Sequence, residues 1–356
     1  MLISLSDVQM FIDNEGDPKL GAEELKAIAD VESSPPPMPS HISSDLDSDL
    51  ANLRIQDDSD SSIFSIHTSA ASKGAFASRD IQRGDLILSE KPIVCIPTMG
   101  LVPLMCGAIE TAVGNLSPTH LDGYLSLHNS HDTCECFPIP LLGIFGTNAM
   151  ITTGINGGVC LRASRFNHSC SPNAHYSFNS NTGEIRIYAL GTIPRGEEIF
   201  VPYLCLFQSR QSRQANLRRR YHFTCACSVC SLPEAESKKS DARRQRLMKL
   251  FETISRFDFA KANQHLNCAV EGIRLLREEG CLGGADNFTY LAGPICAYYS
   301  DWVSTSYWAS LTYHARVAEF GEDSPKAAEV RELYLNPKSF DYAGVGSPKD
   351  LTRFRV

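Results

Sequence analysis

The spacing of apolar residues divides the chain into a strand-rich part and a helix-rich part. Between residues 63 and 204, short apolar runs are separated by turn residues such as Asp, Asn, Gly and Pro, which is typical of β-strands joined by tight turns. From about residue 233 onward, apolar residues recur every three or four positions, which is the period of an amphipathic helix. The pattern predicts an α+β protein, with a β-rich domain followed by a helical C-terminal region.

Individual strands are predicted from the alternation of apolar and polar residues and from the turn residues between such stretches. Apolar and polar residues alternate from Glu184 to Ala189, and the turn-forming residues 179–183 precede them, so residues 175–178 and 184–189 should form a hairpin. Further strands are predicted at residues 63–68, 86–89 and 199–201.

Helices are predicted from start signals and from apolar stripes. Ser117 followed by Pro118 is typical of a helix start and predicts a helix that runs to about His128. In the C-terminal region a helix is expected at 298–320, as one or two segments, and Pro325 should open the last one. Two apolar stripes predict two more helices, the first at Leu247, Leu250, Phe251 and Ile254 and the second at Leu266, Val270, Ile273 and Leu276.

Charge separates the N-terminal segment from the rest. Residues 1–62 contain fourteen Asp and Glu but three Lys and Arg, a net charge of −11, whereas the whole chain carries −8, which leaves +3 for residues 63–356. The segment is rich in Ser and Pro and poor in the aromatic and β-branched residues that offset the entropy lost on folding. We predict that residues 1–62 form a disordered acidic tail rather than a docking arm for a basic partner.

The chain shows no sign of export or of membrane insertion. Residues 1–10 lack a positively charged start followed by a long apolar run, and no stretch approaches the roughly 18 consecutive apolar residues of a membrane span. We therefore expect a protein of the nucleus, the cytoplasm or both. In a reducing compartment, clustered cysteines are typical of metal sites or reactive thiols.

Three of the 13 cysteines are clustered, at Cys225, Cys227 and Cys230. Thiolates are soft ligands, and four of them around zinc form the commonest structural site of this kind. One ligand must therefore come from elsewhere in the chain, and spacing alone does not choose it. The candidates are Cys170, Cys205, Cys160 and the pair Cys134 and Cys136.

Four separated segments, in this order, resemble a SET-domain protein lysine methyltransferase. Each alone is modest evidence, but together they are specific, and they cover about residues 62–232. They are Ser72-Lys-Gly-Ala-Phe-Ala77 with Arg83-Gly-Asp-Leu-Ile87, Arg165-Phe-Asn-His-Ser-Cys-Ser-Pro-Asn173, Gly196-Glu-Glu-Ile-Phe-Val-Pro-Tyr203, and Tyr221-His-Phe-Thr-Cys-Ala-Cys-Ser-Val-Cys230.

The resemblance implies a fold and a division into domains. A β-rich SET fold, made of small sheets with a pseudoknot, would occupy residues 63–204. A post-SET zinc-binding segment would follow at 205–232, and the helical region would occupy 233–356. The layout resembles fungal SET proteins related to the branch that carries a MYND finger. The finger itself needs a denser Cys and His array than residues 95–145 supply, so we read it as absent.

The resemblance also implies the residues of the site. Tyr203 and Tyr221 would be the catalytic and channel tyrosines, and Cys170 would join Cys225, Cys227 and Cys230 around Zn²⁺. The implied cofactor is S-adenosyl-L-methionine. The residues expected to contact it are Lys73, Gly74, Asn148, Asn167, His168, Tyr203, Tyr221 and Phe223.

The expected partner is a protein with a target lysine, either a histone tail or a non-histone protein. We expect a monomer that does not bind membranes and contacts nucleic acid only indirectly, if at all. The arginines between Arg210 and Arg220 have helical spacing and are predicted to form a solvated face. The alternative function is a catalytically inactive SET module that acts as a chromatin or protein-interaction scaffold, because Ser72 stands where the family has glycine.

Overall fold

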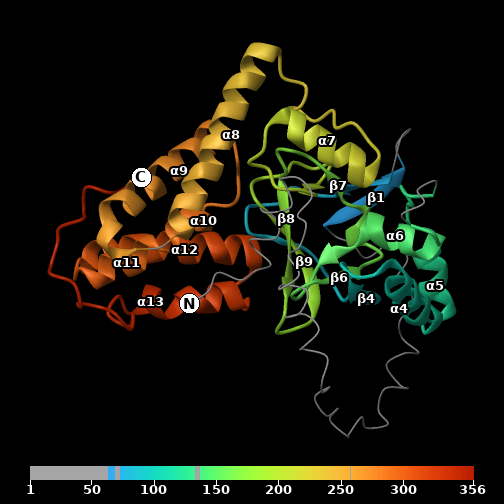
Figure 1. Ribbon diagram of the computed structural model, residues 1–356, viewed down its shortest axis with the longest axis horizontal. Helices are drawn as coiled ribbons and strands as arrows, with labels where there is room; N and C mark the ends of the chain where they lie inside the picture. Colours follow the sequence, from blue (N-terminus) through green and yellow to red (C-terminus); the bar gives the residue numbers. More distant parts are fainter. Residues whose placement is uncertain (1–62, 69–72, 133–136, 257) are drawn as a thin grey trace, which may run out of the picture.

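A computed structural model describes residues 63–68, 73–132, 137–256 and 258–356 of the chain (Figure 1). The predicted disordered tail at 1–62 lies outside the described residues, as do Ser72, Cys134 and Cys136. The mixture of small sheets with many helices confirms the α+β prediction. Among the described helices, none combines the length and apolarity that crossing a bilayer requires.

The strands form four small sheets rather than one large sheet, as expected for the SET fold. The predicted hairpin is present, with the central strand paired on both sides in the order β3-β9-β8. The predicted strands agree with the observed ones to within one or two residues, but the apolar pattern did not predict β2, β4, β5, β6 or β7. The sheets are β1 (Phe64–Thr68) with β2 (Lys73–Ala77); β3 (Leu86–Glu90), β9 (Glu184–Ala189) and β8 (Ala174–Asn179); β4 (Val94–Pro97), β6 (Asn156–Val159) and β5 (Met150–Ile151); and β7 (Asn167–His168) with β10 (Phe200–Val201).

Three helices cover the β4-β6-β5 sheet and share a core with it: α4 (Val102–Gly114), α5 (Pro118–Leu125) and α6 (Pro140–Asn148). The start of α5 is as predicted, with the Ser117 side chain accepting from the main-chain N–H of His120. The helix ends at Leu125, so the prediction that it reaches about His128 was wrong by one turn. The other two helices lack a clear apolar stripe, because α4 is apolar on most sides and α6 contains two glycines.

The helical region confirms the predicted apolar stripes, whose residues point into shared cores of the helices. The expected range 298–320 contains one helix, which begins at Trp302, and the helix before it ends at Tyr298. Between the two lies Ser300, a non-glycine residue with a left-handed φ of 60°. The C-terminal helices are α8 (Glu234–Ser255), α9 (Ala262–Glu278), α10 (Asp286–Thr289), α11 (Ala292–Tyr298), α12 (Trp302–Phe320) and α13 (Pro325–Leu335).

The strand-rich and helical parts meet at the β8–β9 hairpin. In Figure 1 the helices α8–α13 lie on one side of this hairpin and α4–α6 on the other. The ring of Phe320, at the end of α12, lies edge-on to His175 of β8 at 5.2 Å between centroids. Arg186 of β9 forms an ion pair with Asp323 at 2.6 Å, just beyond α12. The helical region is therefore packed on the sheet whose strand β8 directly follows the Asn-His motif segment.

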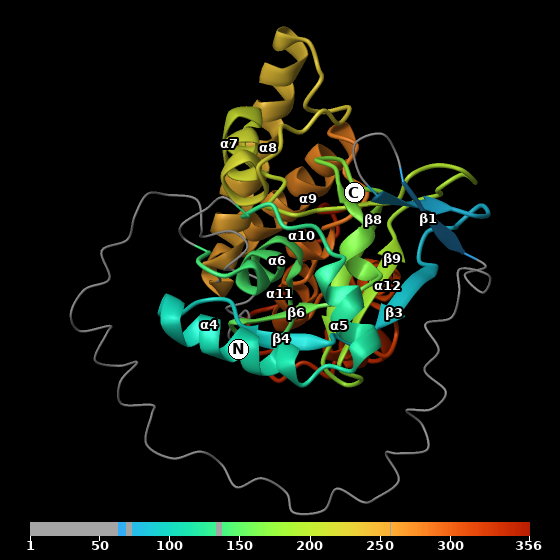
Figure 2. The same cartoon turned by 90° about the vertical axis from the view of Figure 1, so that its right-hand side faces the viewer.

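One more helix, α7 (Arg210–Tyr221), connects the two parts and lies beside α8 in both views (Figures 1 and 2). The main-chain N–H of Arg210 donates to Asp241 of α8 at 2.7 Å. The helix ends where His222 adopts a left-handed φ of 57°, and the chain then turns into the cysteine-rich loop. The helix therefore places Tyr221 and the cysteines side by side.

Candidate functional site

Two motif segments that are far apart in the sequence pair directly with each other. Strand β7 runs parallel to β10, with Asn167 opposite Phe200 and His168 opposite Val201. The main-chain N–H of Ser169 continues the pairing by donating to Val201 at 3.4 Å. This pairing sets the Asn-His turn next to the residues that lead into Tyr203.

The two predicted tyrosines are neighbours. The rings of Tyr203 and Tyr221 lie 5.0 Å apart between centroids, at an angle of 45°. The hydroxyl of Tyr203 donates to the carbonyl oxygen of Phe166 at 2.7 Å, and that of Tyr221 donates to the carbonyl oxygen of Tyr203 at 3.5 Å. Burial raises the pKa of both hydroxyls above the ordinary value. Both side chains are therefore neutral hydrogen-bonding groups at physiological pH.

A third tyrosine belongs to this group and was not predicted. Burial raises the pKa of the Tyr176 hydroxyl, and the neighbouring Tyr221 raises it further, while Tyr176 in turn acts on the pKa of Tyr203. Tyr176 lies on β8 and packs against the core of the SET part together with Phe178. Its position was detectable: it shares the core-facing register with Phe178, on the strand that follows the Asn-His motif.

His168 connects the tyrosines with the cysteines. Its Nδ1 accepts a hydrogen bond from the main-chain N–H of Tyr203 at 3.0 Å, so the ring proton belongs on Nε2. The Nε2 atom lies 3.4 Å from the sulfur of Cys170. Burial lowers the pKa of His168 to about 4. A neutral imidazole thus donates toward Cys170 and accepts from the main chain of Tyr203.

Asn167 is held by two of the other motif segments. Its amide nitrogen donates to the carbonyl oxygen of Lys73 at 3.1 Å and to the Glu198 carboxylate at 2.7 Å. A Cβ at Gly74 would collide with that carboxylate and lie 3.1 Å from the Asn167 amide. A side chain at position 74 would therefore displace the Glu198 carboxylate and crowd the Asn167 amide, which join β2 to the Asn-His turn.

The last two predicted contact residues lie in different surroundings. Phe223 packs in the cluster around the cysteines, with its ring 6.3 Å from that of His168. Asn148 lies at the end of α6, and its amide nitrogen donates to the carbonyl oxygens of His128 and Ile144, both at 2.7 Å. Asn148 therefore ties α6 to the preceding turn, and its contact with a cofactor stays a prediction.

The cysteines form the predicted group of four. The sulfurs of Cys170, Cys225, Cys227 and Cys230 all lie within 4.8 Å of one another. Hydrogen bonds from the neighbouring thiols, that of Cys170 first, lower the pKa of Cys227, which favours a thiolate there. Four sulfurs at this separation are the donor set of a tetrahedral zinc site.

The structure separates Cys170 from the alternative fourth ligands. Cys160 is buried and directs its sulfur toward the carbonyl oxygen of Glu90, and Cys205 belongs to the core of the helical region. The loop itself is held by α7, where Gln214 donates to the carbonyl oxygen of Cys225 at 2.6 Å and accepts from its N–H at 3.0 Å.

The arginines of α7 do not share one environment. Arg218, Arg219 and Arg220 are exposed, as predicted for a solvated face. Arg213 is fully buried, so the prediction was wrong at this position. The helix is covered on that side by the cysteine loop and by α8, and a buried guanidinium there faces the sulfurs rather than solvent.

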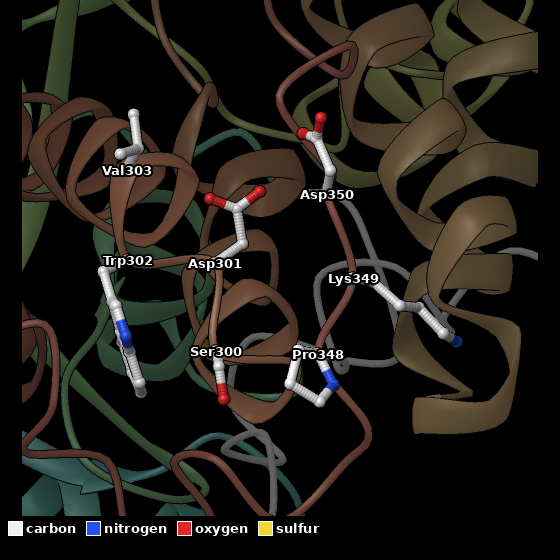
Figure 3. A pocket seen from close by; sticks show the side chains of 7 residues that line it. All are labelled: Ser300, Asp301, Trp302, Val303, Pro348, Lys349 and Asp350. Atoms are coloured by element: carbon white, nitrogen blue, oxygen red, sulfur yellow. The ribbon is translucent and has the colours of Figure 1, made fainter.

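A pocket of about 370 Å³ lies elsewhere, at the junction of α12 and the C-terminal segment (Figure 3). Its polar side chain Asp301 is already engaged, because the carboxylate accepts from the main-chain N–H groups of Ser304 at 3.0 Å and Leu351 at 2.7 Å. The pocket therefore carries no visible chemistry of its own. It is lined by Ser300, Asp301, Trp302, Val303, Pro348, Lys349 and Asp350.

The paired β7 and β10, the adjoining tyrosines and the group of four cysteines define a SET-domain protein with a post-SET cysteine centre. The family model described as "SET domain" matches residues 72–204. The histone-lysine N-methyltransferase set5 of Schizosaccharomyces pombe is 30% identical over 269 residues, which cover 75% of this chain and 81% of the relative. The chain belongs to the SET-domain family of protein-lysine methyltransferases.

Two further similarities are more limited in extent. The protein-lysine N-trimethyltransferase SMYD5 of Danio rerio is 46% identical over 76 residues, which are 20% of this chain and 18% of that protein. The solved SET domain of LSMT, bound to lysine and AdoHcy, matches with a TM-score of 0.32 and 12% identity, over 80% of this chain and 90% of that one.

Proposed function

We propose that this chain is an S-adenosylmethionine-dependent protein-lysine N-methyltransferase with a structural zinc centre. The observation that carries the proposal is the pair Tyr203 and Tyr221, both half-buried, with their ring centroids 5.0 Å apart beside the Asn167–His168 turn. Neutral hydroxyls on apolar ring walls are suited to orient an uncharged amine while excluding water. Membership of the methyltransferase family supports the same conclusion.

The tyrosines would prepare the substrate lysine. A free lysine has a pKa near ~10.4, and an apolar channel lowers it because the charged form is desolvated. The Tyr203 hydroxyl is fixed by Phe166, and that of Tyr176 lies within electrostatic range of both other hydroxyls. Three oriented hydroxyls would therefore hold the amine nitrogen in line for attack.

The methyl donor would lie against the segments that meet at Asn167. When bound, S-adenosylmethionine supplies an electrophilic methyl group on a sulfonium sulfur. The main chain at Gly74 packs closely against the Glu198 carboxylate and the Asn167 amide, so a donor that contacts this part of β2 would meet a glycine rather than a bulky side chain. The proposed contacts are Lys73, Gly74, Asn167, His168, Tyr203, Tyr221 and Phe223, with Asn148 in a supporting position behind them.

Zinc would tie the post-SET loop to the core. Cys170 follows β7 directly, whereas Cys225, Cys227 and Cys230 come from the loop after α7. A metal bound by all four would fix the loop next to Tyr221 and Phe223, because both residues pack in the same cluster as the thiols. We propose 63–204, 205–232 and 233–356 as the SET, post-SET and helical units.

The substrate class and the location follow from the family and remain at the level of a proposal. We propose that the chain acts as a monomer on a histone tail or another protein, in the nucleus, the cytoplasm or both, without binding nucleic acid directly. The relative of Schizosaccharomyces pombe named above is a histone-lysine methyltransferase, which favours histones as the first substrates to test.

The test is a methyl-transfer assay with a radiolabelled donor on purified histones and on whole-cell lysate, followed by mass spectrometry of labelled proteins. Tyr203→Phe should reduce turnover at least about 100-fold while zinc content and donor affinity stay near those of the wild type. Tyr342→Phe, at a site that is 57% exposed, is the matched control. Unchanged methylation by Tyr203→Phe would remove this residue from the mechanism.

The second candidate is an inactive SET scaffold, which the serine at position 72 favours. Calorimetry with S-adenosylmethionine separates the two functions. No affinity at high micromolar concentration, for a wild-type protein that holds one zinc, would support the scaffold and exclude the enzyme.

A further inference from the structure

Arg213 is a buried cation without a close carboxylate partner. The side chain is fully buried in α7, one helical turn before Leu217, which packs in the cysteine cluster. Its Nη1 donates to the carbonyl oxygen of Gln208 at 2.5 Å, and the carboxylate of Asp241 lies 3.8 Å away. The same Asp241 oxygen accepts the main-chain N–H of Arg210 at 2.7 Å.

Two of the three nitrogens of Arg213 have no hydrogen-bond partner among the described residues. The two atoms are Nε and Nη2, and both are buried without a hydrogen-bond acceptor. Burying a guanidinium in this state costs several kcal/mol unless negative charge lies nearby. The guanidinium lies on the side of α7 that carries Leu217 into the cysteine cluster, and the groups that act on it electrostatically there are the sulfurs of Cys170 and Cys230.

A four-thiolate zinc centre would supply that negative charge. One Zn²⁺ with four thiolates carries a formal charge of −2, and this group would lie in a cluster of largely buried residues. An attraction between that dianion and a guanidinium is strong where water is excluded. The N–H groups of Arg213 would therefore gain negatively charged acceptors, and the guanidinium would offset part of the negative charge of the thiolates.

We propose that Arg213 is the positioning cation of the zinc centre, compensating the charge of the Cys170, Cys225, Cys227 and Cys230 thiolates from the buried side of α7. This inference rests on the zinc centre proposed above. It assigns to α7 a role in metal affinity in addition to its role in presenting Tyr221 and the loop.

Arg244 of α8, the other fully buried arginine beside this site, differs in a way that makes it a useful comparison. Its Nη2 donates to the carbonyl oxygen of Cys170 at 3.1 Å, but its Nε pairs with the buried Glu279 at 2.7 Å. Unlike Arg213, Arg244 therefore has a carboxylate at hydrogen-bond distance, although Glu279 also pairs with Arg243 at 2.7 Å. Arg244 holds the main chain of a ligand, whereas Arg213 faces the sulfurs.

The experiment compares the zinc affinity of full-length wild type, Arg213→Met and Arg213→Lys by competition with a chromophoric chelator. Arg213→Met keeps much of the side-chain volume but removes the charge and should weaken zinc binding about 10- to 100-fold. Arg213→Lys keeps the charge and should recover most of that loss. Arg219→Met, an exposed arginine on the same helix, should bind zinc like the wild type.

Two further measurements distinguish charge from packing. The pH at which zinc is released on acidification should rise by roughly 0.5–1 unit in Arg213→Met, because thiolates without a neighbouring cation take up protons more readily. The sulfur-to-metal charge-transfer band of the Co²⁺-substituted protein should shift in Arg213→Met and return toward the wild-type position in Arg213→Lys.

Each outcome decides between distinct conclusions. The proposal would be overturned if Arg213→Met bound zinc within twofold of the wild-type affinity and released it within 0.2 pH unit of the wild type. It would also be overturned if Arg213→Lys bound zinc as weakly as Arg213→Met. If Arg213→Met does not fold, the proposal is tested by the zinc affinity of Arg213→Lys and by the spectrum of its Co²⁺ form. A wild-type protein with no bound zinc would instead refute the metal centre itself.

Discussion

The main-chain N–H of Tyr203 donates a hydrogen bond to Nδ1 of His168 at 3.0 Å. On the other side of the same ring, Nε2 lies 3.4 Å from the sulfur of Cys170. One imidazole therefore joins the proposed catalytic tyrosine to a proposed zinc ligand. A substitution of the cysteines should consequently alter the position of Tyr203, and a substitution of His168 should affect both Tyr203 and the zinc site.

Replacing this histidine should affect metal and turnover together. His168→Phe keeps a ring of similar size but removes both hydrogen bonds, so we expect zinc affinity to fall about 10-fold or more and turnover to fall about 100-fold. Zinc competition and the methyl-transfer assay measure the two effects. His314→Gln, an exposed histidine of α12, is the control. A variant that loses turnover with unchanged zinc affinity would break the link between the two sites.

Removing Cys170 should release zinc while leaving the core folded. Cys170→Ser takes one of four sulfurs from the cluster, and we expect bound zinc to fall from one equivalent toward zero. Metal content by atomic emission and far-UV circular dichroism give the two readouts. Cys281→Ser, outside the group of four, should retain the metal. Full retention of zinc by Cys170→Ser would reassign the fourth ligand.

A methyl group at position 74 should damage donor binding specifically. In Gly74→Ala the new Cβ would collide with the Glu198 carboxylate, which in turn holds the Asn167 amide. Displacing these groups should cost about 1–3 kcal/mol, or roughly 10- to 100-fold in affinity for S-adenosylmethionine by calorimetry. Gly107→Ala in α4 has open space around it and should bind the donor normally. Equal affinities of the two variants would refute this account of Gly74.

Tyr176 should control how many methyl groups are transferred. Its hydroxyl lies within electrostatic range of those of Tyr203 and Tyr221, so removing it should make room for a methylated amine beside them. We expect Tyr176→Phe to retain measurable activity and to shift the products toward higher methylation, read by mass spectrometry of the modified lysine. Tyr203→Phe, which loses the hydroxyl fixed by Phe166, should instead lose activity. An unchanged product distribution in Tyr176→Phe would place its hydroxyl outside the channel.

The features that sequence could predict are those encoded locally. Alternation identified β9, and Ser117 with Pro118 identified the start of α5, because each depends on residues close in the chain. The motif segments predicted that Asn167, His168 and Tyr203 belong to one site, and the pairing of β7 with β10 brings them together. In contrast, α4 was missed because it is apolar on most sides, so no stripe marks its buried face.

The features that sequence could not predict depend on long-range packing. Helical spacing predicts that Arg213 shares the exposed surface of α7, and only the covering of that side by α8 and the cysteine loop buries it. Spacing alone also left Cys205 and Cys160 as possible ligands, and their exclusion depends on which sulfurs the folded chain brings within 4.8 Å. The register with Phe178 could have placed Tyr176 on the core-facing side of β8, but its proximity to Tyr203 and Tyr221 depends on how separate segments pack.

The contact between the sheet and the helical region should weaken in acid through His175. Burial lowers the pKa of this side chain to about 4, Lys326 lowers it further, and Asp286 opposes them. In the unfolded chain the value is about 6.5. The unfolded state therefore binds the proton more tightly, so the stabilisation is complete above about pH 6.5 and is lost progressively as the pH falls to about 4.

The size of this effect follows from the shift. It corresponds to at most about 3 kcal/mol of unfolding free energy between these two pH values. His175→Gln cannot take up a proton in this range, so the difference in unfolding free energy between wild type and variant, from urea titrations at pH 4.5, 5.5 and 7, should shrink as the pH falls. His314→Gln should keep the slope of the wild type. If the unfolding free energies of wild type and His175→Gln instead changed in parallel with pH, the acid sensitivity of the protein would arise from another group. The His175 ring, which packs against Phe320, would then have the same pKa in the folded and unfolded states.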